Sequence, residues 1–391
     1  MGSPAPGPAG SQLPPDRGNP LLKRLDRLIG IPALVLVGAS RRLRGRRAVP
    51  EDWQTIGLLK TAAIGDVILL SGVIRDLRAA HPSARIVLFV TATNAGFARL
   101  LDGPDDVIVL PVRAVPRAVR EVRAEHVDVF VDFGSWPRFD ALVSVLSGAH
   151  CTIGRRTRAQ HRHYAYDIVV DHASDRHELD NFRALVAPLG VHSTSDPTIP
   201  APTGPPPLPA DYAVLHRWPG GANCAERSWP DDHWRALAEA FTARGLDVVL
   251  TGGPGDVAAT ADIVRDWDAE GIRAHAAAGG TPADCARWLS HSAGVVSVNT
   301  GVMHLAAALD VPTIGLSGPT SCRRWGPIGP RARCVPSPVI PGGYLDLGFE
   351  RDDRYPDCMD AITVDAVLEE WDALVSGERH APQPRREPDS A

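Results

Sequence analysis

Two segments of the sequence combine glycine with polar side chains where an apolar run gives way to helical spacing. They are Lys60-Thr-Ala-Ala-Ile-Gly-Asp66 and Asn299-Thr-Gly-Val-Met-His304. Glycine lets a ligand approach the backbone closely, and the N–H groups at a helix start bind anions. Asp66 would stay ionised in a first helical turn and could accept a proton. Read alone, Asp66 could also be a helix-start acid, and Asn299 and Thr300 simple N-caps.

A third segment, Gly252-Gly253-Pro254-Gly255-Asp256, also follows an apolar run, as does the isolated Gly318. With Ala258, its glycines match the G-x-G-x-x-A fingerprint of dinucleotide-binding domains. However, Pro254 lacks the N–H that a phosphate would bind, and the next apolar run ends without an acid for the ribose. These departures disfavour a nicotinamide or flavin site.

The sequence offers no other recognisable catalytic motif. It contains no P-loop, no G-x-S-x-G and no H-E-x-x-H. The crowded histidines at positions 161, 163, 172 and 177 lack metal-ligand spacing with cysteine or carboxylates. None of these patterns therefore points to a metal or cofactor site. The arginine-rich segment 155–162 is interpreted as a polar loop that faces either an acceptor or, as we favour, solvent.

Alternating strand and helix patterns surround these segments and indicate two α/β domains with parallel sheets. Seven prolines between residues 197 and 210 exclude a helix or a central strand and predict a stiff linker. We expect an N-terminal domain over 53–196 and a C-terminal domain with a closing helix over 211–376. Strands are expected at 56–60, 86–90, 107–110, 127–132, 212–215, 247–251, 294–298 and 313–316, and helices at 67–80, 95–101, 114–125, 231–243, 256–266, 281–290 and 302–309.

The 391 residues carry a net charge of −5, which is unevenly distributed. Residues 20–47 hold eight basic side chains and one acid around an apolar stretch, so this segment is +7 and the remainder −12. Within the terminal region 1–52, residues 1–19 are rich in Pro, Gly and Ser and are expected to be disordered, as is the tail 377–391. Segment 20–47 is typical of a helix on an anionic membrane surface; an ordinary surface helix and a cleaved signal are the alternatives.

Composition limits the class of protein further. An apolar content of 44% excludes a disordered chain, and no apolar run is long enough to span a bilayer. Because nearly all basic residues are arginine, a coding bias explains their abundance, and we expect no nucleic-acid partner. The six scattered cysteines form no C-x-x-C pair and are expected to be reduced thiols in the cytoplasm.

Taken in order, the motifs resemble those of glycosyltransferase family 9, the ADP-heptose:lipopolysaccharide heptosyltransferases and their relatives. The resemblance spans roughly residues 53–376, and the ordered combination is far more specific than any single motif. It is carried by Lys60-Thr-x-x-Ile-Gly-Asp66, Arg227-Ser-Trp229-Pro230, Gly252-Gly253-Pro254, Asn299-Thr-Gly-x-Met-His304, Gly318-Pro319-Thr320, Arg324-Trp325-Gly326-Pro327 and Asp357-Cys358-Met359.

The resemblance implies a GT-B fold, in which two Rossmann-like domains enclose an active-site cleft. It implies inverting transfer, without an obligatory metal, from an ADP-linked or other nucleotide-diphosphate sugar to a hydroxyl of a glycan, lipid-linked or small-molecule acceptor. Asp66 would be the general base. Together with the basic segment 20–47, the resemblance predicts a cytoplasmic enzyme that is peripheral on the inner face of the cell membrane. The donor and its diphosphate would contact Arg227, Gly252, Gly253, Asp256, Asn299, Thr300, Gly301, His304 and Gly318, and Lys60, Thr61 and Gly65 would lie on the acceptor side.

Three positions depart from the family pattern. Asn299 replaces the usual Asp, Asp256 replaces a longer Glu near the ribose, and Arg217-Trp218 interrupts the usual His-Pro-Gly-Ala run. The departures suggest a donor or acceptor different from those of the lipopolysaccharide enzymes. They also keep two alternatives open. One is a nucleotide-sugar epimerase or nicotinamide oxidoreductase, and the other is a catalytically silent nucleotide-sugar-binding protein.

Overall fold

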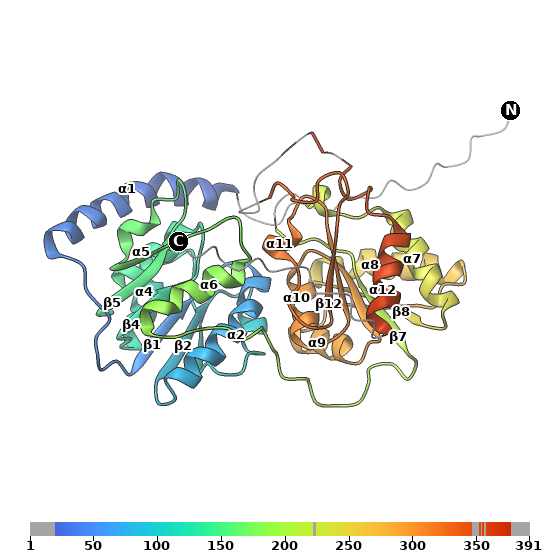
Figure 1. The fold of residues 1–391 in the computed structure, drawn as a ribbon, viewed down its shortest axis with the longest axis horizontal. Coiled ribbons are helices and arrows are strands. Elements are labelled where there is room, and N and C mark those ends of the chain that lie inside the picture. The colour runs from blue at the N-terminus through green and yellow to red at the C-terminus, as the bar shows by residue number, and fades with distance from the viewer. Residues whose placement is uncertain (1–19, 222–223, 346–351, 353, 356, 377–391) are drawn as a thin grey trace.

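The structure is a computed structural model that describes residues 20–221, 224–345, 352, 354–355 and 357–376, arranged as two α/β lobes side by side (Figure 1). The tails 1–19 and 377–391, predicted to be disordered, lie outside these residues. The N-terminal lobe contains a six-stranded parallel sheet with the order β3-β2-β1-β4-β5-β6. Its strands are β1 (Thr55–Leu59), β2 (Arg85–Val90), β3 (Asp106–Val109), β4 (Val129–Asp132), β5 (Cys151–Arg156) and β6 (Ile168–Asp171), and its helices are α1 (Pro20–Arg44), α2 (Ile64–Ala80), α3 (Ala95–Ala98), α4 (Val115–Ala124), α5 (Arg138–Leu146) and α6 (Glu178–Val186).

The C-terminal lobe repeats this architecture with a second six-stranded parallel sheet, in the order β12-β11-β10-β7-β8-β9. Between the sheets, residues 190–211 contain no helix or strand, in keeping with the proline-rich linker. The strands are β7 (Tyr212–His216), β8 (Asp247–Gly252), β9 (Ala274–Ala278), β10 (Gly294–Val298), β11 (Thr313–Ser317) and β12 (Ala332–Pro336), and the helices are α7 (Asp231–Ala243), α8 (Val257–Ala269), α9 (Pro282–Ser290), α10 (Gly301–Ala308), α11 (Cys322–Trp325) and α12 (Val364–Val375).

Both sheets have the strand order of a Rossmann fold, which confirms the predicted α/β class with two parallel sheets. The order reverses between β1 and β4 in the first sheet and between β7 and β10 in the second. Ligands of open α/β sheets bind beyond the carboxyl ends of the strands at such a reversal. The segments 60–66 and 299–304 directly follow β1 and β10, so the topology places both at reversal points.

Most apolar runs predicted as strands are buried inside the sheets, because parallel strands are covered by helices on both faces; the run at 107–110 instead forms the partly buried edge strand β3. The helix predicted at 95–101 is shorter and spans Ala95–Ala98, and the helix predicted at 256–266 starts after a 3-10 turn at Pro254–Asp256. Sequence patterns gave no expectation for β5, β6, β12, α5, α6 or α11. These elements are short or contain charged residues, and the period of their apolar residues is correspondingly weak.

Helix α1 lies along the outside of the N-terminal lobe, where it packs on α5 (Figure 1). Oδ1 of Asp26 accepts hydrogen bonds from the backbone N–H groups of Arg138 and Phe139 at 2.8 and 3.0 Å, so α1 supplies the N-terminal cap of α5. Leu34 is completely buried on the same side. No helix within the described part of the chain is long and apolar enough to cross a membrane.

Candidate active site

The two predicted glycine segments meet, because the N-termini of α2 and α10 abut each other across the lobe boundary. A Cβ atom at Gly65 would lie 2.6 Å from Cδ2 of His304. A Cβ atom at Gly301 would lie 2.6 Å from Cγ2 of Ile64 and 3.0 Å from the backbone N of Gly65. Only glycine at both positions permits this approach. The close approach brings the carboxylate of Asp66 and the anion-binding start of α10 into one site.

Asp66 is buried at the start of α2 and is paired with a lysine. Nζ of Lys60 lies 2.6 Å from Oδ2 of Asp66, and the two side chains are 2% and 9% exposed. Burial raises the pKa of Asp66 above 3.8, while the Lys60 charge lowers it. We expected the helix terminus to keep Asp66 an ordinary, weakly basic carboxylate. Burial instead makes it a stronger base, because a raised pKa favours proton acceptance.

Lys60 and Thr61 hold the backbone of the Asp66 loop through their buried side chains. Besides pairing with Asp66, Lys60 donates from Nζ to the carbonyl oxygen of Phe133 at 3.4 Å. The hydroxyl of Thr61 donates to Oδ1 of Asp140 at 2.6 Å. Their predicted contact with the acceptor stays a prediction, and the geometry adds a role in positioning Asp66.

A buried acidic pair lies behind this loop. Oδ2 of Asp132 accepts hydrogen bonds from Arg162 and from the hydroxyl of Tyr166, each at 2.6 Å. Burial and the nearby Asp132 raise the pKa of Asp140 to about 7. We favoured a solvent-facing loop at 155–162, and this interpretation is wrong for its two end residues. Arg155 and Arg162 are only 1% and 0% exposed, and each pairs with a buried acid.

His304 is a buried, neutral imidazole at the lobe boundary. Desolvation by burial and the nearby His177 lower its pKa to about 3. Within the described residues, its Nδ1 is buried and has no hydrogen-bond partner. A neutral imidazole can donate one hydrogen bond to a ligand but carries no charge. His304 can therefore contribute a directed hydrogen bond to a donor phosphate.

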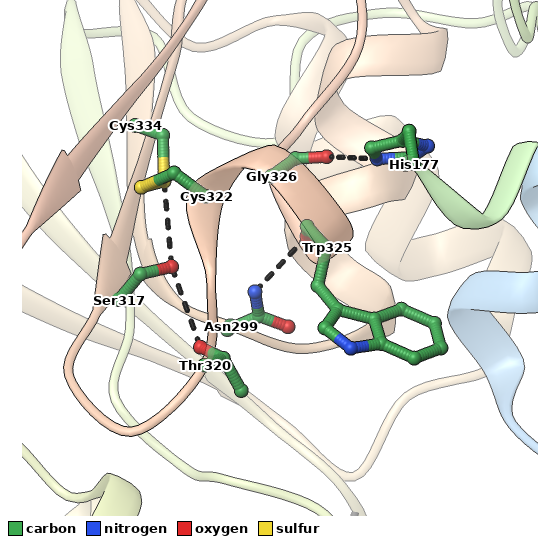
Figure 2. Close-up of a disulfide and its surroundings, with 8 residues drawn as sticks. All are labelled: His177, Asn299, Ser317, Thr320, Cys322, Trp325, Gly326 and Cys334. Carbon is green, nitrogen blue, oxygen red and sulfur yellow. Dashed lines mark hydrogen bonds between the residues drawn. A yellow bond between two sulfur atoms is a disulfide. The ribbon is translucent and has the colours of Figure 1, made fainter. Parts of the chain in front are cut away.

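The N-cap interpretation of Asn299 and Thr300 is wrong. Thr300 occupies the N-cap position of α10, but its side chain does not cap the helix. Nδ2 of Asn299 donates instead to the backbone oxygen of Trp325 at 3.0 Å (Figure 2). An aspartate could not make this donation, because an ionised carboxylate only accepts hydrogen bonds. The departure from the family pattern at Asn299 thus has a structural function, which is to join this loop to the end of α11.

The remaining predicted donor residues lie beyond the carboxyl ends of the second sheet. Arg227 donates to the backbone oxygen of Gly220. Oδ2 of Asp256 accepts from the backbone N of Gly253 at 2.8 Å, so this carboxylate braces its own turn. A Cβ atom at Gly252 would lie 3.0 Å from Cδ1 of Trp218. Gly318 follows β11, and a Cβ atom there would lie 2.5 Å from Sδ of Met359.

The expectation of six reduced thiols is wrong, because Cys322 and Cys334 form a disulfide (Figure 2). The tertiary fold brings the start of α11 next to β12, with a Cα–Cα distance of 5.8 Å. This separation lies within the range that a disulfide spans. The other four cysteines, Cys151, Cys224, Cys285 and Cys358, carry thiols rather than disulfides.

Glu178, His172 and Arg324 form a buried polar cluster between the lobes. Sequence reasoning missed Glu178. It noted His172 only as one of the crowded histidines and Arg324 only as part of a motif that resembles the family, because their contact with each other exists only once the lobes have come together. A cavity of about 370 Å³ adjoins this cluster and is lined by Ser174 and Asp175 of the N-terminal lobe and by Ser321 and Tyr344 of the C-terminal lobe, among others. In the described residues, no group of three or more His, Cys, Asp or Glu side chains could hold a metal ion.

Two Rossmann-like lobes with facing reversal points have the architecture of the GT-B fold, and a carboxylate near a helix N-terminus is compatible with glycosyl transfer. Comparisons with known proteins agree. Residues 117–341 match glycosyltransferase family 9 (heptosyltransferase). Lipopolysaccharide heptosyltransferase 1 of Escherichia coli (strain K12) is 27% identical over 298 residues, covering 67% of this chain and 87% of that protein.

Solved structures share the fold at low sequence identity. E. coli ADP-heptose LPS heptosyltransferase II has a TM-score of 0.68 at 20% identity, covering 83% of this chain and 99% of that one. The dodecameric iron-containing heptosyltransferase TibC, in complex with ADP-D-β-D-heptose, has a TM-score of 0.54 at 15% identity, covering 83% and 77%.

The chain belongs to glycosyltransferase family 9. It is an enzyme that transfers a glycosyl group from a nucleotide sugar, so the glycosyltransferase hypothesis is retained over the epimerase, oxidoreductase and silent binding-protein alternatives.

Proposed function

We propose that the protein moves a heptose or related hexose from an ADP-linked donor to a hydroxyl of a glycan, with a lipid-linked acceptor favoured, and with inversion at the anomeric carbon. The observation that carries the proposal is the meeting of Asp66 and the start of α10 across the lobe boundary, through Gly65 and Gly301. A base and an anion site at two helix N-termini that abut each other fit a displacement in which a hydroxyl attacks and a diphosphate leaves.

In this reaction Asp66 is the general base. Its carboxylate takes the proton of the acceptor hydroxyl while the oxygen forms a bond to the anomeric carbon and the bond to the donor diphosphate breaks. Burial of Asp66 raises its pKa, which supports proton acceptance. Lys60, 2.6 Å away, keeps the carboxyl ionised before the reaction and stabilises the loop that aims it.

The leaving diphosphate is stabilised by the backbone N–H groups at the start of α10, by the guanidinium of Arg227 and by a hydrogen bond from neutral His304. These groups stabilise the negative charge that develops on the diphosphate as its bond to the sugar breaks. We propose that they replace the metal ion that other nucleotide-sugar enzymes use, so that no divalent metal is obligatory. The hydroxyl of Thr300, at the N-cap position of α10, does not cap the helix and lies 3.3 Å from the hydroxyl of Ser297.

The nucleotide lies over the carboxyl ends of β7, β8 and β10, where Gly252 and Gly253 allow close approach. Asp256 braces this turn and reaches less far than the Glu usual in the family. Asn299 is committed to the carbonyl of Trp325. We therefore infer that the ribose and base are held differently from those in the lipopolysaccharide enzymes, with ADP as the first nucleotide to test.

We also propose that the protein works at the inner face of the cell membrane, held there by α1. While one side of α1 packs on α5, its opposite side exposes an apolar stripe at helical spacing. Exposed arginines flank the stripe, as required for binding anionic lipid. The stripe consists of Leu28, Ile29, Val35, Leu36 and Leu43, whose exposed fractions are 72, 62, 49, 72 and 90%.

A panel of ADP-, GDP-, UDP- and dTDP-sugars tests the transfer proposal, with thermal shift to measure binding and nucleotide release to measure turnover. An ADP-sugar should give the largest shift and release ADP. The Asp66→Asn variant should bind the donor like the wild type but lose turnover by at least about 100-fold. Wild-type turnover in Asp66→Asn would remove Asp66 from the mechanism, and lack of any response to the panel would contradict the donor assignment.

Flotation with phosphatidylglycerol vesicles tests the membrane proposal. The triple variant Leu28→Ser, Leu36→Ser, Leu43→Ser should lose binding, and added salt should weaken binding of the wild type. Its matched control replaces three exposed valines elsewhere, Val112→Ser, Val257→Ser and Val375→Ser, and should still bind. Equal binding by both triple variants would contradict a role for α1.

A further inference from the structure

Helix α11 carries a residue that reaches from the C-terminal lobe into the N-terminal lobe. Nη1 of Arg324 lies 2.5 Å from Oε2 of Glu178 on α6, and Nη2 lies 2.9 Å from Nε2 of His172. The Arg324 and Glu178 side chains are 4% and 0% exposed. Loss of one partner would leave the other charge buried and incompletely compensated. This ion pair can form only when the two lobes are together.

Glu178 begins a chain of contacts that ends at Asp66. Its Oε1 accepts from Nη1 of Arg155 at 2.5 Å, and Nη2 of Arg155 donates to the carbonyl oxygen of Phe133 at 3.2 Å. The same carbonyl accepts from Nζ of Lys60 at 3.4 Å. Nζ of Lys60 in turn lies 2.6 Å from Oδ2 of Asp66. Every side chain in this series of contacts is buried and has no water to replace a lost partner, so a displacement of one side chain displaces the next.

The end of α11 is also tied to the donor side and to the second sheet (Figure 2). Asn299 donates to the backbone oxygen of Trp325, and Nε2 of His177 lies 3.0 Å from the backbone oxygen of Gly326. Because Nδ1 of His177 accepts the N–H of Leu179, Nε2 carries the proton in that second bond. The disulfide joins Cys322, the first residue of α11, to β12. Helix α11 therefore contacts the donor loop, the N-terminal lobe and the second sheet at once.

We propose that Arg324 is a positioning residue for the general base. By holding Glu178 and, through it, Arg155 and Lys60, it keeps Asp66 in its reactive place only while the lobes are closed and the donor loop is seated on α11. This inference rests on the proposed function, because it takes Asp66 as the base. It assigns to Arg324 no contact with the substrate.

The charged groups around these contacts predict that substitutions at Arg324 and at Glu178 change the ionisation of Asp66 in opposite directions. Asp66 faces Lys60, Arg155 on β5 and Glu178 on α6, and neutral His304 lies across Gly65. Glu178 in turn faces Arg155, Arg324 and His172. Removing the Arg324 cation leaves more of the Glu178 charge to act on Asp66, so Asp66 becomes harder to ionise. Removing the Glu178 charge makes Asp66 easier to ionise.

The test is the pH dependence of kcat, measured from pH 5 to 9 with saturating donor. The acid limb of this profile, where kcat falls as Asp66 becomes protonated, should move to higher pH by about half a unit or more in Arg324→Met. It should move to lower pH in Glu178→Gln. The donor KM should change less than about threefold while kcat at pH 6 falls in Arg324→Met by about tenfold. Arg324→Lys, which keeps the charge, should return the limb most of the way to that of the wild type.

The matched control is Arg323→Met, which removes the exposed neighbouring arginine on α11 and should leave the profile unchanged. Limbs that shift in the same direction, or not at all, in folded Arg324→Met and Glu178→Gln would overturn the proposal. If Arg324→Met does not fold, the contrast between Arg324→Lys and Glu178→Gln provides the same test. Full turnover in Asp66→Asn would instead refute the proposed base, so the two failures are distinguishable.

Discussion

Lys60→Met removes the cation that lies 2.6 Å from Asp66 and leaves the carboxyl buried without it. Loss of one partner of a buried ion pair costs about 3 to 5 kcal/mol. Asp66 can limit this cost by binding a proton. For a carboxyl with the ordinary pKa of 3.8, binding a proton costs at most about 4.4 kcal/mol at pH 7 and about 1.6 kcal/mol at pH 5.

The sign of the pH dependence follows from linkage. A carboxyl whose pKa is higher in the folded state binds more protons there than in the unfolded chain. Stability is therefore lost as pH rises above the unfolded value near 3.8 and continues to fall until the folded pKa is passed. Lys60→Met raises that folded pKa further, so its deficit against the wild type should be small at pH 5 and grow toward pH 7.

Urea unfolding at pH 5, 6 and 7 measures this deficit. The control is Arg117→Met, which breaks an exposed pair with Glu121 on α4 and should cost less than about 0.5 kcal/mol at every pH. If Lys60→Met is destabilised by the same amount at all three pH values, Lys60 does not control the ionisation of Asp66.

Three further predictions concern the site and its support. Gly301→Ala would place a Cβ atom 2.6 Å from Cγ2 of Ile64, so kcat should fall by about tenfold or more. Gly342→Ala, with no atom within 4 Å of its Cβ, should leave the rate unchanged, and equal rates in the two variants would contradict the close approach of α2 and α10. Thiol titration of the unfolded, unreduced chain should find four thiols of the six cysteines, and reduction should lower the free energy of unfolding by about 3 kcal/mol; six thiols would contradict the disulfide. Because the pKa of His304 is about 3, the activity profile above pH 5 should contain no inflection from this residue, and His304→Gln should retain more activity than His304→Ala; an inflection near pH 6.5 that disappears in His304→Gln would refute a neutral His304.

Several parts of the site could be predicted from local sequence because their chemistry is local. A glycine followed by an acid after an apolar run already indicates a strand, a turn and a helix start, as at Gly65 and Asp66. The same pattern placed Gly301 and His304 at a second helix start. The strand periodicity around both segments then determined that each would lie at the carboxyl edge of a parallel sheet.

Other parts could not be predicted, because they depend on residues that meet only after the lobes have folded. Arg155 and Arg162 look like a solvated basic run, yet each is buried against an acid from a distant element. The pairing of Cys322 with Cys334 needs β12 beside the start of α11. The hydrogen bond that Asn299 donates to the backbone oxygen of Trp325 likewise depends on a residue 26 positions further along the chain.

The sequence by itself determined the α/β class, the two-sheet organisation and the identity of the two loops that meet, because apolar period and glycine placement act over a few residues. Only the tertiary structure decided how strong a base Asp66 is and which charges surround it. The pKa of a carboxyl depends on burial and on nearby charges. Of the charges that act on Asp66, only Lys60 is close to it in the sequence, whereas Arg155 and Glu178 come from β5 and α6, far along the chain.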